Sequence, residues 1–152
     1  MSNELREFDR SLPMRLLQAR EAVMRSFLPS LREHDLSAQQ WRVLRALVEV
    51  DNRDASQIAQ RCAILLPSLS RILQNLDGRG LISRKTCDED QRRSLVSISR
   101  KGRRLVDKIA PLSEERYDDI TRRFGQENLA ALYDLLGELI DCMEDQEDVG
   151  SA

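Results

Sequence analysis

Aromatic residues are scarce in this 152-residue sequence, at 4% of the chain. Proteins that hold single-stranded nucleic acid by stacking its bases on aromatic side chains need such residues, so this mode of binding is not expected. No apolar run approaches the roughly eighteen residues of a membrane-spanning helix. The opening residues, MSNELREFDRSLP, are charged where a signal peptide has an apolar core. These absences predict a cytoplasmic protein with no membrane partner.

Signatures of metal binding and catalysis are also missing. The cysteines Cys62, Cys87 and Cys142 form neither a C-x-x-C pair nor a zinc-like spacing with the single histidine, His34. The sequence has no nucleophile elbow and no phosphate-binding loop. We therefore expect no enzymatic activity, no metal and no cofactor. An odd number of cysteines suits free thiols in a reducing compartment, and a redox-sensitive Cys87 is the alternative.

Charge is distributed unevenly along the chain. Between Arg61 and Lys108, twelve lysines and arginines stand against five acidic residues, which gives this segment a net charge of +7. The whole chain has a net charge of −2, so the remainder is strongly acidic. A polyanion is attracted to such a basic segment, whereas the rest of the surface repels it. The length suits one domain with helical extensions.

The spacing of apolar residues predicts several helices. Four of them are expected over 12–33, over 37–50, from Ser56, and over 67–79. Ser37 is expected to cap the second helix, with Gln40 completing a capping box. Pro29 is expected to kink or interrupt the first. Gly78 and Gly80 are expected to stop the fourth.

A two-stranded hairpin is predicted to follow these helices. Apolar Val96 and Ile98 alternate with Ser97 and Ser99, a period-two pattern, and 81–86 is a less regular partner strand. The sequence CDEDQRRS lies at the tip of the hairpin. Ser99 is expected to cap a further helix, and a last helix follows Gly125. Helix, turn, helix and hairpin in this order predict a mainly α fold with a small β-wing, a winged helix-turn-helix.

The helix over 67–79 offers candidate DNA-binding residues. Its apolar face leaves short polar and basic side chains on the opposite face, as a helix in a major groove requires. These residues are Ser68, Ser70, Arg71, Gln74 and Asn75. Arg71 suits guanine and either amide suits adenine, whereas the two serines suit phosphate. The alternative is an ordinary solvated helix face.

The hairpin carries a second group of candidates. Arg84, Lys85, Arg92 and Arg93 lie on or beside it, and arginine is attracted to narrow A·T-rich minor grooves. Asp90 precedes Arg92 by two residues and is expected to orient its guanidinium through hydrogen bonds. A simple solvated turn is the alternative.

Three segments resemble the multiple antibiotic resistance regulator (MarR) family of dimeric winged-helix repressors. They are LSAQQWRVLRAL (36–47), SQIAQRCAILLPSLSRILQNLDGRGLISR (56–84) and DEDQRRSLVSISRKGRRL (88–105). The resemblance implies a single domain over 1–152, with dimerisation helices over 12–35 and 103–146 and a DNA-binding lobe over 36–102. It also implies a recognition helix over 67–79 and a wing over 87–93, where Asp90 and Arg92 match the family's D-x-R pattern. Ser99 stands where the family usually has threonine.

The resemblance also implies a small-molecule effector. Family effectors are commonly small phenolic or aromatic acids bound between the dimerisation helices and the DNA-binding lobe. Arg20 falls in the apolar stripe of the first helix, so its charge needs an anionic partner. A ligand carboxylate meets that need, with Trp41 stacking on the ligand and Arg45 beside it. Glu49 or an acid of a second subunit is the alternative partner. Arg15 and His34 are further candidates.

The expected function is therefore a homodimeric transcriptional repressor that binds a pseudo-palindromic DNA operator and is released by an aromatic acid. LLQAREAVM (16–24), QQWRVLR and CAILLPSLSRIL resemble regulators of 4-hydroxyphenylacetate and homoprotocatechuate degradation operons. Two alternatives stay open. One is a redox-responsive repressor, and the other is a helical protein-interaction module whose basic face docks an acidic partner.

Overall fold

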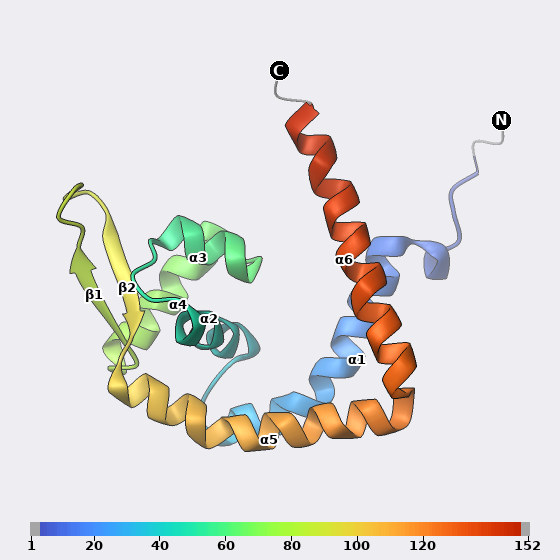
Figure 1. Cartoon of the computed structure of the whole chain (residues 1–152), viewed down its shortest axis with the longest axis horizontal. Coiled ribbons are helices and arrows are strands. Elements are labelled where there is room, and N and C mark those ends of the chain that lie inside the picture. The colour runs from blue at the N-terminus through green and yellow to red at the C-terminus, as the bar shows by residue number, and fades with distance from the viewer. Residues whose placement is uncertain (1–3, 150–152) are drawn as a thin grey trace. The chain divides into compact units, whose positions relative to one another are not determined.

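The computed structural model describes residues 4–149, with side chains to residue 145. Six α-helices and one two-stranded sheet occur in that range, so the expected mainly α fold with a β-wing is confirmed (Figure 1). The chain comprises two compact units, divided between Leu112 and Ser113. The elements are a short 3-10 helix (Phe8–Arg10), α1 (Leu12–Glu33), α2 (Ala38–Glu49), α3 (Ala55–Cys62), α4 (Leu66–Gly78), β1 (Ile82–Thr86), β2 (Ser94–Ile98), α5 (Arg100–Phe124) and α6 (Gln126–Val149).

Helix α1 continues through Pro29, so the expected interruption does not occur. Proline removes one backbone donor from the helix. Phe27 and Leu31, on either side of it, are both buried, and this packing holds the helix together across the proline. The hydroxyls of Ser26 and Ser30 donate to the carbonyls three residues earlier, at 2.8 and 3.1 Å.

Two capping boxes fix the starts of α2 and α3. The Gln40 N–H donates to Ser37 Oγ at 3.1 Å, and the Ser37 N–H donates to Gln40 Oε1 at 2.9 Å, as predicted. The same exchange joins Asp54 and Gln57, at 2.8 and 3.0 Å. Helix α3 therefore begins at Ala55 and not at Ser56, because the cap is the aspartate and not the serine.

Of the two glycines expected to stop helix α4, the second, Gly80, forms the left-handed turn that ends it. Gly78 is the last helical residue, whereas Gly80 adopts a left-handed backbone with φ +71°. The Gly80 N–H donates to the Asp77 carbonyl and the Leu81 N–H to the Leu76 carbonyl, both at 2.9 Å. This pair of bonds is a Schellman motif, which satisfies the last carbonyls of the helix.

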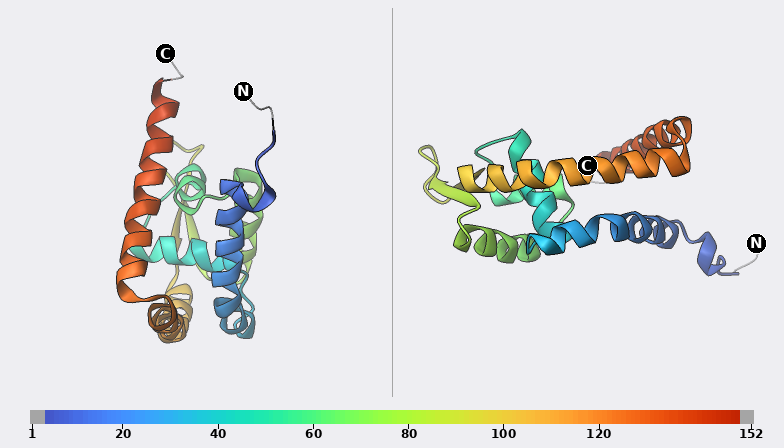
Figure 2. Two further views of the ribbon diagram at one scale, coloured as in Figure 1. Left: turned by 90° about the vertical axis from the view of Figure 1, so that its right-hand side faces the viewer. Right: turned by 90° about the horizontal axis from the view of Figure 1, so that it is seen from below.

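The hairpin of β1 and β2, here called the wing, is antiparallel, with Ile82 opposite Ile98 and Thr86 opposite Ser94. Its tip projects beyond the helices of the first unit (Figure 2). The polar turn before α3 adds an isolated bridge to the other side of β2. The Arg53 N–H donates to the Val96 carbonyl at 3.1 Å, and the Val96 N–H donates back at 2.8 Å. Sequence pattern gave no sign of this bridge, because it joins residues that are far apart in the chain.

The hydrophobic core of the first unit lies between α2, α3, α4, the wing and the start of α5. Ile58, Ala59 and Cys62 of α3 are buried in it, as predicted, with Leu69, Ile72, Leu73 and Leu76 of α4. Val106 and Ile109 of α5 belong to the same core. The unit therefore extends ten residues beyond the end of the lobe expected over 36–102.

The start of α5 is packed tightly on the turn after α4. The Ser99 N–H donates to the Leu81 carbonyl at 3.0 Å, and Ser99 Oγ accepts the Gly102 N–H at 3.0 Å, which confirms the predicted cap. A Cβ atom on Gly102 would lie 2.1 Å from the Leu81 carbonyl oxygen. Only glycine fits at this contact.

The second unit contains the end of α5 and helix α6. Gly125, with φ +99°, separates the two helices, as expected from the sequence. Leu135 and Ile140 are 62% and 53% exposed, so the predicted apolar face of α6 is uncovered in the single chain. None of the helices over 4–149 is both long enough and apolar enough to cross a membrane.

Gly102→Ala is expected to destabilise the protein by about 3 kcal/mol, the upper end for overpacking, because the added carbon meets backbone and not a movable side chain. Urea unfolding at fixed protein concentration measures this change. Gly78→Ala is the matched control, since a carbon added there has nothing within 4 Å. Equal stability of the two variants would show that the contact at Gly102 relaxes freely.

Candidate nucleic-acid interface

The outer face of α4 carries all five residues that the sequence singled out on this helix. Ser68, Ser70, Arg71, Gln74 and Asn75 are exposed, while the apolar positions of the same helix are buried. The Schellman motif and the core hold the helix, so this face is presented on a rigid element. Such a surface is what a major groove accepts.

Two of these five side chains form hydrogen bonds within the protein. Asn75 Oδ1 accepts a hydrogen bond from Gln40 Nε2 of α2 at 2.9 Å. Ser70 Oγ donates to the Leu66 carbonyl at 3.1 Å. Bidentate pairing with adenine uses both the oxygen and the nitrogen of an amide. The amide of Gln74 has no partner among the described residues, so both of its polar atoms are available for such a pairing.

The loop at the wing tip is organised by Asp90, though not as expected. Asp90 Oδ1 accepts the backbone N–H of Arg92 at 3.0 Å and does not hold its guanidinium. A separation of two residues suits a turn in which the carboxylate bonds the backbone. The Cys87 N–H donates to the Arg93 carbonyl at 2.9 Å and closes the loop. The Arg92 side chain is exposed, with no hydrogen bond to any described residue.

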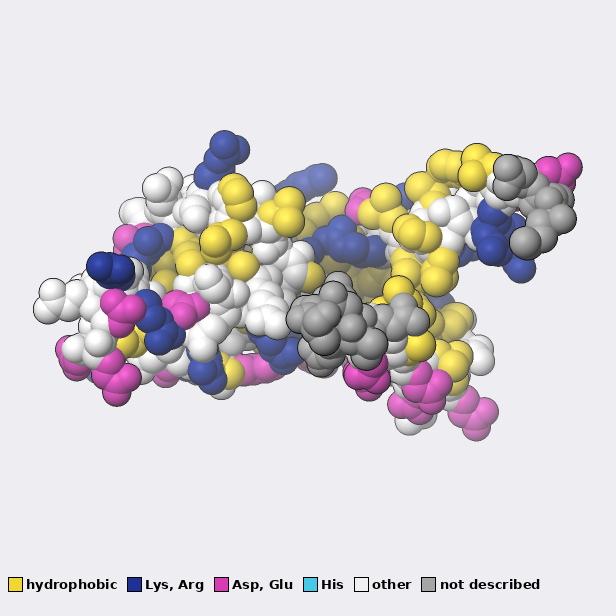
Figure 3. Space-filling view, turned by 90° about the horizontal axis from the view of Figure 1, so that it is seen from above, with side chains coloured by type: hydrophobic (Ala, Val, Ile, Leu, Met, Phe, Trp, Pro, Cys, Tyr) yellow, Lys and Arg dark blue, Asp and Glu magenta, His cyan; other side chains and the backbone are white. Residues whose placement is uncertain are grey.

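The other wing cations divide into paired and unpaired groups. Arg93 Nη2 lies 2.6 Å from Asp54 Oδ2, and Arg84 Nε lies 3.8 Å from Asp77 Oδ2. Lys85 and Arg92 have no carboxylate within ion-pair distance among the described residues. Lysine and arginine side chains alternate with acidic ones on the surface at this end of the molecule (Figure 3). The sequence alone did not separate these two groups.

Asp54 links the wing to the helix-turn-helix. Its Oδ1 accepts the Gln57 N–H at the start of α3, and its Oδ2 accepts from Arg93. The backbone N–H of Gln57 is the main cause that lowers the pKa of Asp54 below its usual value, and Arg93 adds to it. One carboxylate thus caps a helix and holds the loop of the wing.

The candidates for the ligand site are less well assembled in the single chain. Arg20 is 44% exposed and pairs with its neighbour Glu21, Nη1 to Oε1 at 3.0 Å. Glu49, one of the alternative partners named for Arg20, pairs instead with Arg61 at 3.3 Å. The stripe around Arg20 is not buried either, since Leu16 is exposed. The need for an anionic partner is correspondingly weaker in this chain alone.

A residue that sequence analysis missed lies beside this group. Arg42 of α2 is half-buried and donates Nη1 to the Cys62 carbonyl at 3.0 Å. Burial lowers the pKa of Arg42, and the positive charge of Arg20 lowers it further. Arg20 is therefore close enough to α2 for the two charges to interact. Nothing in the sequence distinguished Arg42 from the other arginines of its helix.

The remaining ligand candidates lie in different surroundings. Trp41 is 8% exposed and belongs to the core, whereas Arg45 on the same helix is exposed. Arg15 is exposed and donates to Gln18 Oε1 at 3.4 Å. His34 follows the end of α1 and lines a cavity that contains neither Arg20 nor Trp41.

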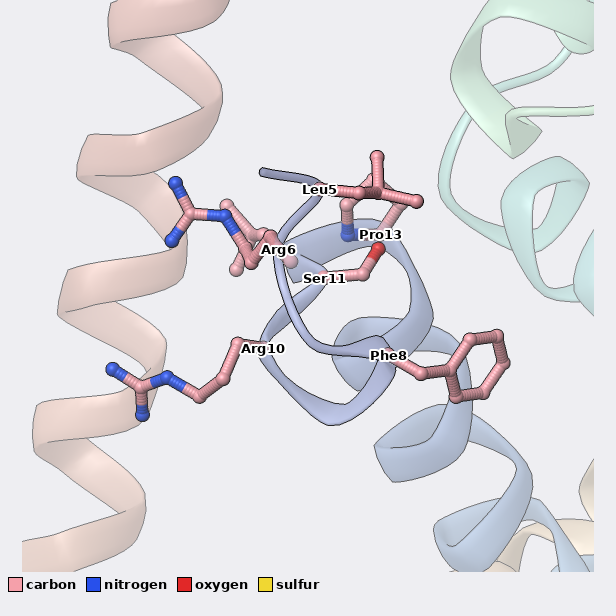
Figure 4. Close-up of a pocket in the computed structure, with 7 residues that line it drawn as sticks. Leu5, Arg6, Phe8, Arg10, Ser11 and Pro13 are labelled. Carbon is pink, nitrogen blue, oxygen red and sulfur yellow. The ribbon is translucent and has the colours of Figure 1, made fainter. Parts of the chain in front are cut away.

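A second hollow, of about 590 Å³, lies at the start of the chain (Figure 4). Its lining comes from the segment before α1 and from the first turn of that helix. Arg6 and Arg10 point to one side of this segment and Phe8 to the other. Phe8 is largely exposed. No sequence pattern marked these residues as a site.

The three cysteines are free thiols in different environments. Cys62 is buried, and burial raises the pKa of its thiol. Cys87 at the wing loop is half-buried, and Cys142 on α6 is exposed.

Comparison with known proteins places this architecture in a family. The family model described as MarR family matches residues 34–93. The HTH-type transcriptional regulator FarR of Neisseria gonorrhoeae is 40% identical over 129 residues, which cover 85% of this chain and 88% of FarR. The chain belongs to the MarR family. The homoprotocatechuate degradative operon repressor of Escherichia coli is 39% identical over 130 residues, covering 86% and 88%.

Solved structures of MarR regulators have the same fold. NadR in complex with 4-hydroxyphenylacetate is similar with a TM-score of 0.77 and 38% identity, covering 90% of this chain and 96% of that one. CouR, a transcriptional repressor bound to a 23-mer DNA duplex, gives a TM-score of 0.79 and 29% identity, covering 90% and 99%. This MarR-family chain is a transcriptional regulator, and the expectation that it is not an enzyme is confirmed.

The Asp54–Arg93 ion pair is expected to add up to about 1 kcal/mol to the unfolding free energy. Asp54→Asn removes the charge but keeps a good helix cap. Because folding lowers the pKa of Asp54, the charge contribution is present above the unfolded value of about 3.9 and is lost as pH falls through the folded value. Urea unfolding of wild type, Asp54→Asn, Arg93→Ala and the double variant should therefore show coupling at neutral pH and none in strong acid. Additive effects at neutral pH would contradict the anchoring role.

Proposed function

We propose that this MarR-family regulator is a homodimeric repressor that binds a pseudo-palindromic DNA operator and leaves it when a small aromatic acid binds. One observation carries the proposal. The polar face of α4 and the unpaired cations of the wing are attached to one core, through the cap at Ser99 and the pair between Asp54 and Arg93. A rigid reading helix beside a basic hairpin suits two neighbouring grooves of a duplex.

The candidate DNA-binding residues have different roles in this proposal, depending on whether their side chains form bonds within the protein. Arg71 and Gln74 read base edges in the major groove, and Ser68 and Ser70 contact phosphates near the start of α4. Arg92 enters the minor groove and Lys85 neutralises phosphate. The positions of the contacting residues are fixed by Asn75, Arg84, Asp90 and Arg93, which bond within the protein.

A second copy of the chain is needed for two reasons. Two recognition helices about 34 Å apart match successive major grooves of a pseudo-palindrome. Exposed apolar side chains in the terminal helices need cover, since large uncovered apolar surfaces mark association sites. Leu16 of α1 and Leu135 and Ile140 of α6 are examples. The helices over 12–35 and 103–146 are therefore the proposed dimerisation region.

The effector is proposed to be a small phenolic acid. Arg20 supplies a positive charge within electrostatic reach of α2, the helix that also carries Trp41 and Arg45. A carboxylate bound there would offset this positive charge, which already lowers the pKa of the neighbouring Arg42. NadR, at 38% identity, was solved with 4-hydroxyphenylacetate. Relatives that repress homoprotocatechuate degradation support control of an operon for aromatic catabolism.

Release requires that the ligand distinguish two states of the dimer. An acid that binds equally well to both states shifts no equilibrium. The acid must therefore prefer a dimer whose recognition helices have the wrong spacing for the operator. The alternative protein-interaction module predicts no sequence preference on duplex DNA.

Arg92→Ala is expected to weaken binding to the duplex that flanks the protein's own gene by about 1–3 kcal/mol, because a minor-groove contact is lost. Lys85→Ala should mainly lower the salt dependence of binding. Fluorescence anisotropy over a salt series measures both effects. Arg32→Ala, an exposed cation on α1, is the control. Equal affinities and slopes for Arg92→Ala, Lys85→Ala and the control would contradict the wing assignment.

Adding 4-hydroxyphenylacetate or homoprotocatechuate is expected to reduce operator affinity at least tenfold at saturation, within the usual range of allosteric coupling of roughly 1–3 kcal/mol. The uncharged analogue 4-hydroxyphenylacetamide is the matched control and should have little effect. In Arg20→Gln the response to the acid should be lost. Operator affinity that is unchanged by either acid would reject this effector class while leaving DNA binding intact.

A further inference from the structure

A basic cavity in the first unit has no role in the function proposed above. Its volume is about 310 Å³, and it lies where the ends of α1 and α4 meet the base of the wing and the first turns of α5. The lining consists of His34, Arg79, Leu81, Lys101, Arg104, Leu105 and Lys108. The lining thus combines four lysine or arginine side chains, one histidine and two leucines, and no carboxylate belongs to it.

Part of this lining is held in place by backbone carbonyls. Arg79 donates Nη1 to the Asp35 carbonyl at 2.8 Å and Nη2 to the His34 carbonyl at 3.3 Å. Lys101 Nζ donates to the Arg79 carbonyl at 2.9 Å. The His34 ring donates Nδ1–H to the Ser30 carbonyl at 2.8 Å. Carbonyls fix these groups without neutralising them, so their charge remains available.

The cationic side chains of α5 that line the cavity repel one another when no anion is bound. Lys101, Arg104 and Lys108 follow one another at spacings of three and four residues, which brings like charges together on one helix face. Pairs of like charges at these spacings destabilise a helix. None of the three forms an ion pair with a described carboxylate. A bound anion would remove this repulsion.

We propose that this cavity binds a small organic polyanion that carries phosphate groups. The cations take the charged groups, and Leu81 and Leu105 contact the apolar part of the ligand. The volume is at the lower end of the roughly 300–1,000 Å³ of small-molecule sites. Of the aromatic-acid candidates only His34 lines this cavity, whereas Arg15, Arg20, Trp41 and Arg45 do not.

The position of the cavity argues against the operator as its occupant. The cavity is lined by Leu81, just before β1, whereas Arg92 lies in the loop beyond the other end of this five-residue strand. Such a strand spans about 17 Å. On α4 the cavity uses Arg79, just after the last helical turn, whereas the groove-reading residues Arg71 and Gln74 lie earlier in the helix.

Pyrophosphate is the probe for this site, because it offers two phosphates in a small volume. Isothermal titration of the full-length protein compares wild type with the double variant R104A/K108A. The matched control is R100A/R103A, which removes two exposed cations from the same helix outside the cavity. Arg79 is not substituted, because its guanidinium also donates to the backbone carbonyls of Asp35 and His34. All titrations use one salt concentration.

We expect R104A/K108A to lose at least tenfold in pyrophosphate affinity, because two charged hydrogen-bond donors to phosphate are removed. R100A/R103A should stay within twofold of wild type. Equal losses in the two double variants, or no binding by wild type, would overturn the proposal. So would unchanged pyrophosphate affinity in R104A/K108A with weaker binding to duplex DNA, because the cations would then belong to the operator interface.

Discussion

The contact between the start of α5 and the Leu81 carbonyl organises the DNA-binding lobe. Gly102 allows the helix to approach this carbonyl more closely than any side chain would permit, and Ser99 bonds both sides of the contact. The end of α4, the base of the wing and the first turn of α5 meet there. The recognition helix, the wing and the first turn of α5 thus share one closely packed junction.

Local signals in the sequence predicted most of the fold. The capping box at Ser37, the apolar face of α4 and the alternation in β2 each depend on residues within a few positions of one another. Pro29 and Asp54 show where local reasoning fails. Burial of Phe27 and Leu31 outweighed the effect of the proline. A helix start was expected at Ser56, although Asp54 is the residue that caps α3.

The sequence indicated which residues belong to the candidate DNA-binding surface, but it did not indicate which of them form hydrogen bonds or ion pairs within the protein. Charge and spacing identified the outer face of α4 and the basic wing, because those features are contiguous in sequence. The partners of Arg93 and Asn75 lie 39 and 35 residues away in the sequence. The spacing of apolar residues does not indicate contacts between residues so far apart. The ligand candidates on α1 depend on surfaces that a single chain leaves open. Arg20 therefore has a neighbouring glutamate for a partner where burial was expected.

The wing also has a side that the sheet does not cover. Strand β1 pairs only with β2 within the described residues, so its outer edge offers unpaired backbone groups to any passing strand. Arg84 and Lys85 lie in the middle of this edge. Charged side chains at an exposed edge oppose the addition of another strand. The same two cations thus oppose the joining of wings of different molecules edge to edge.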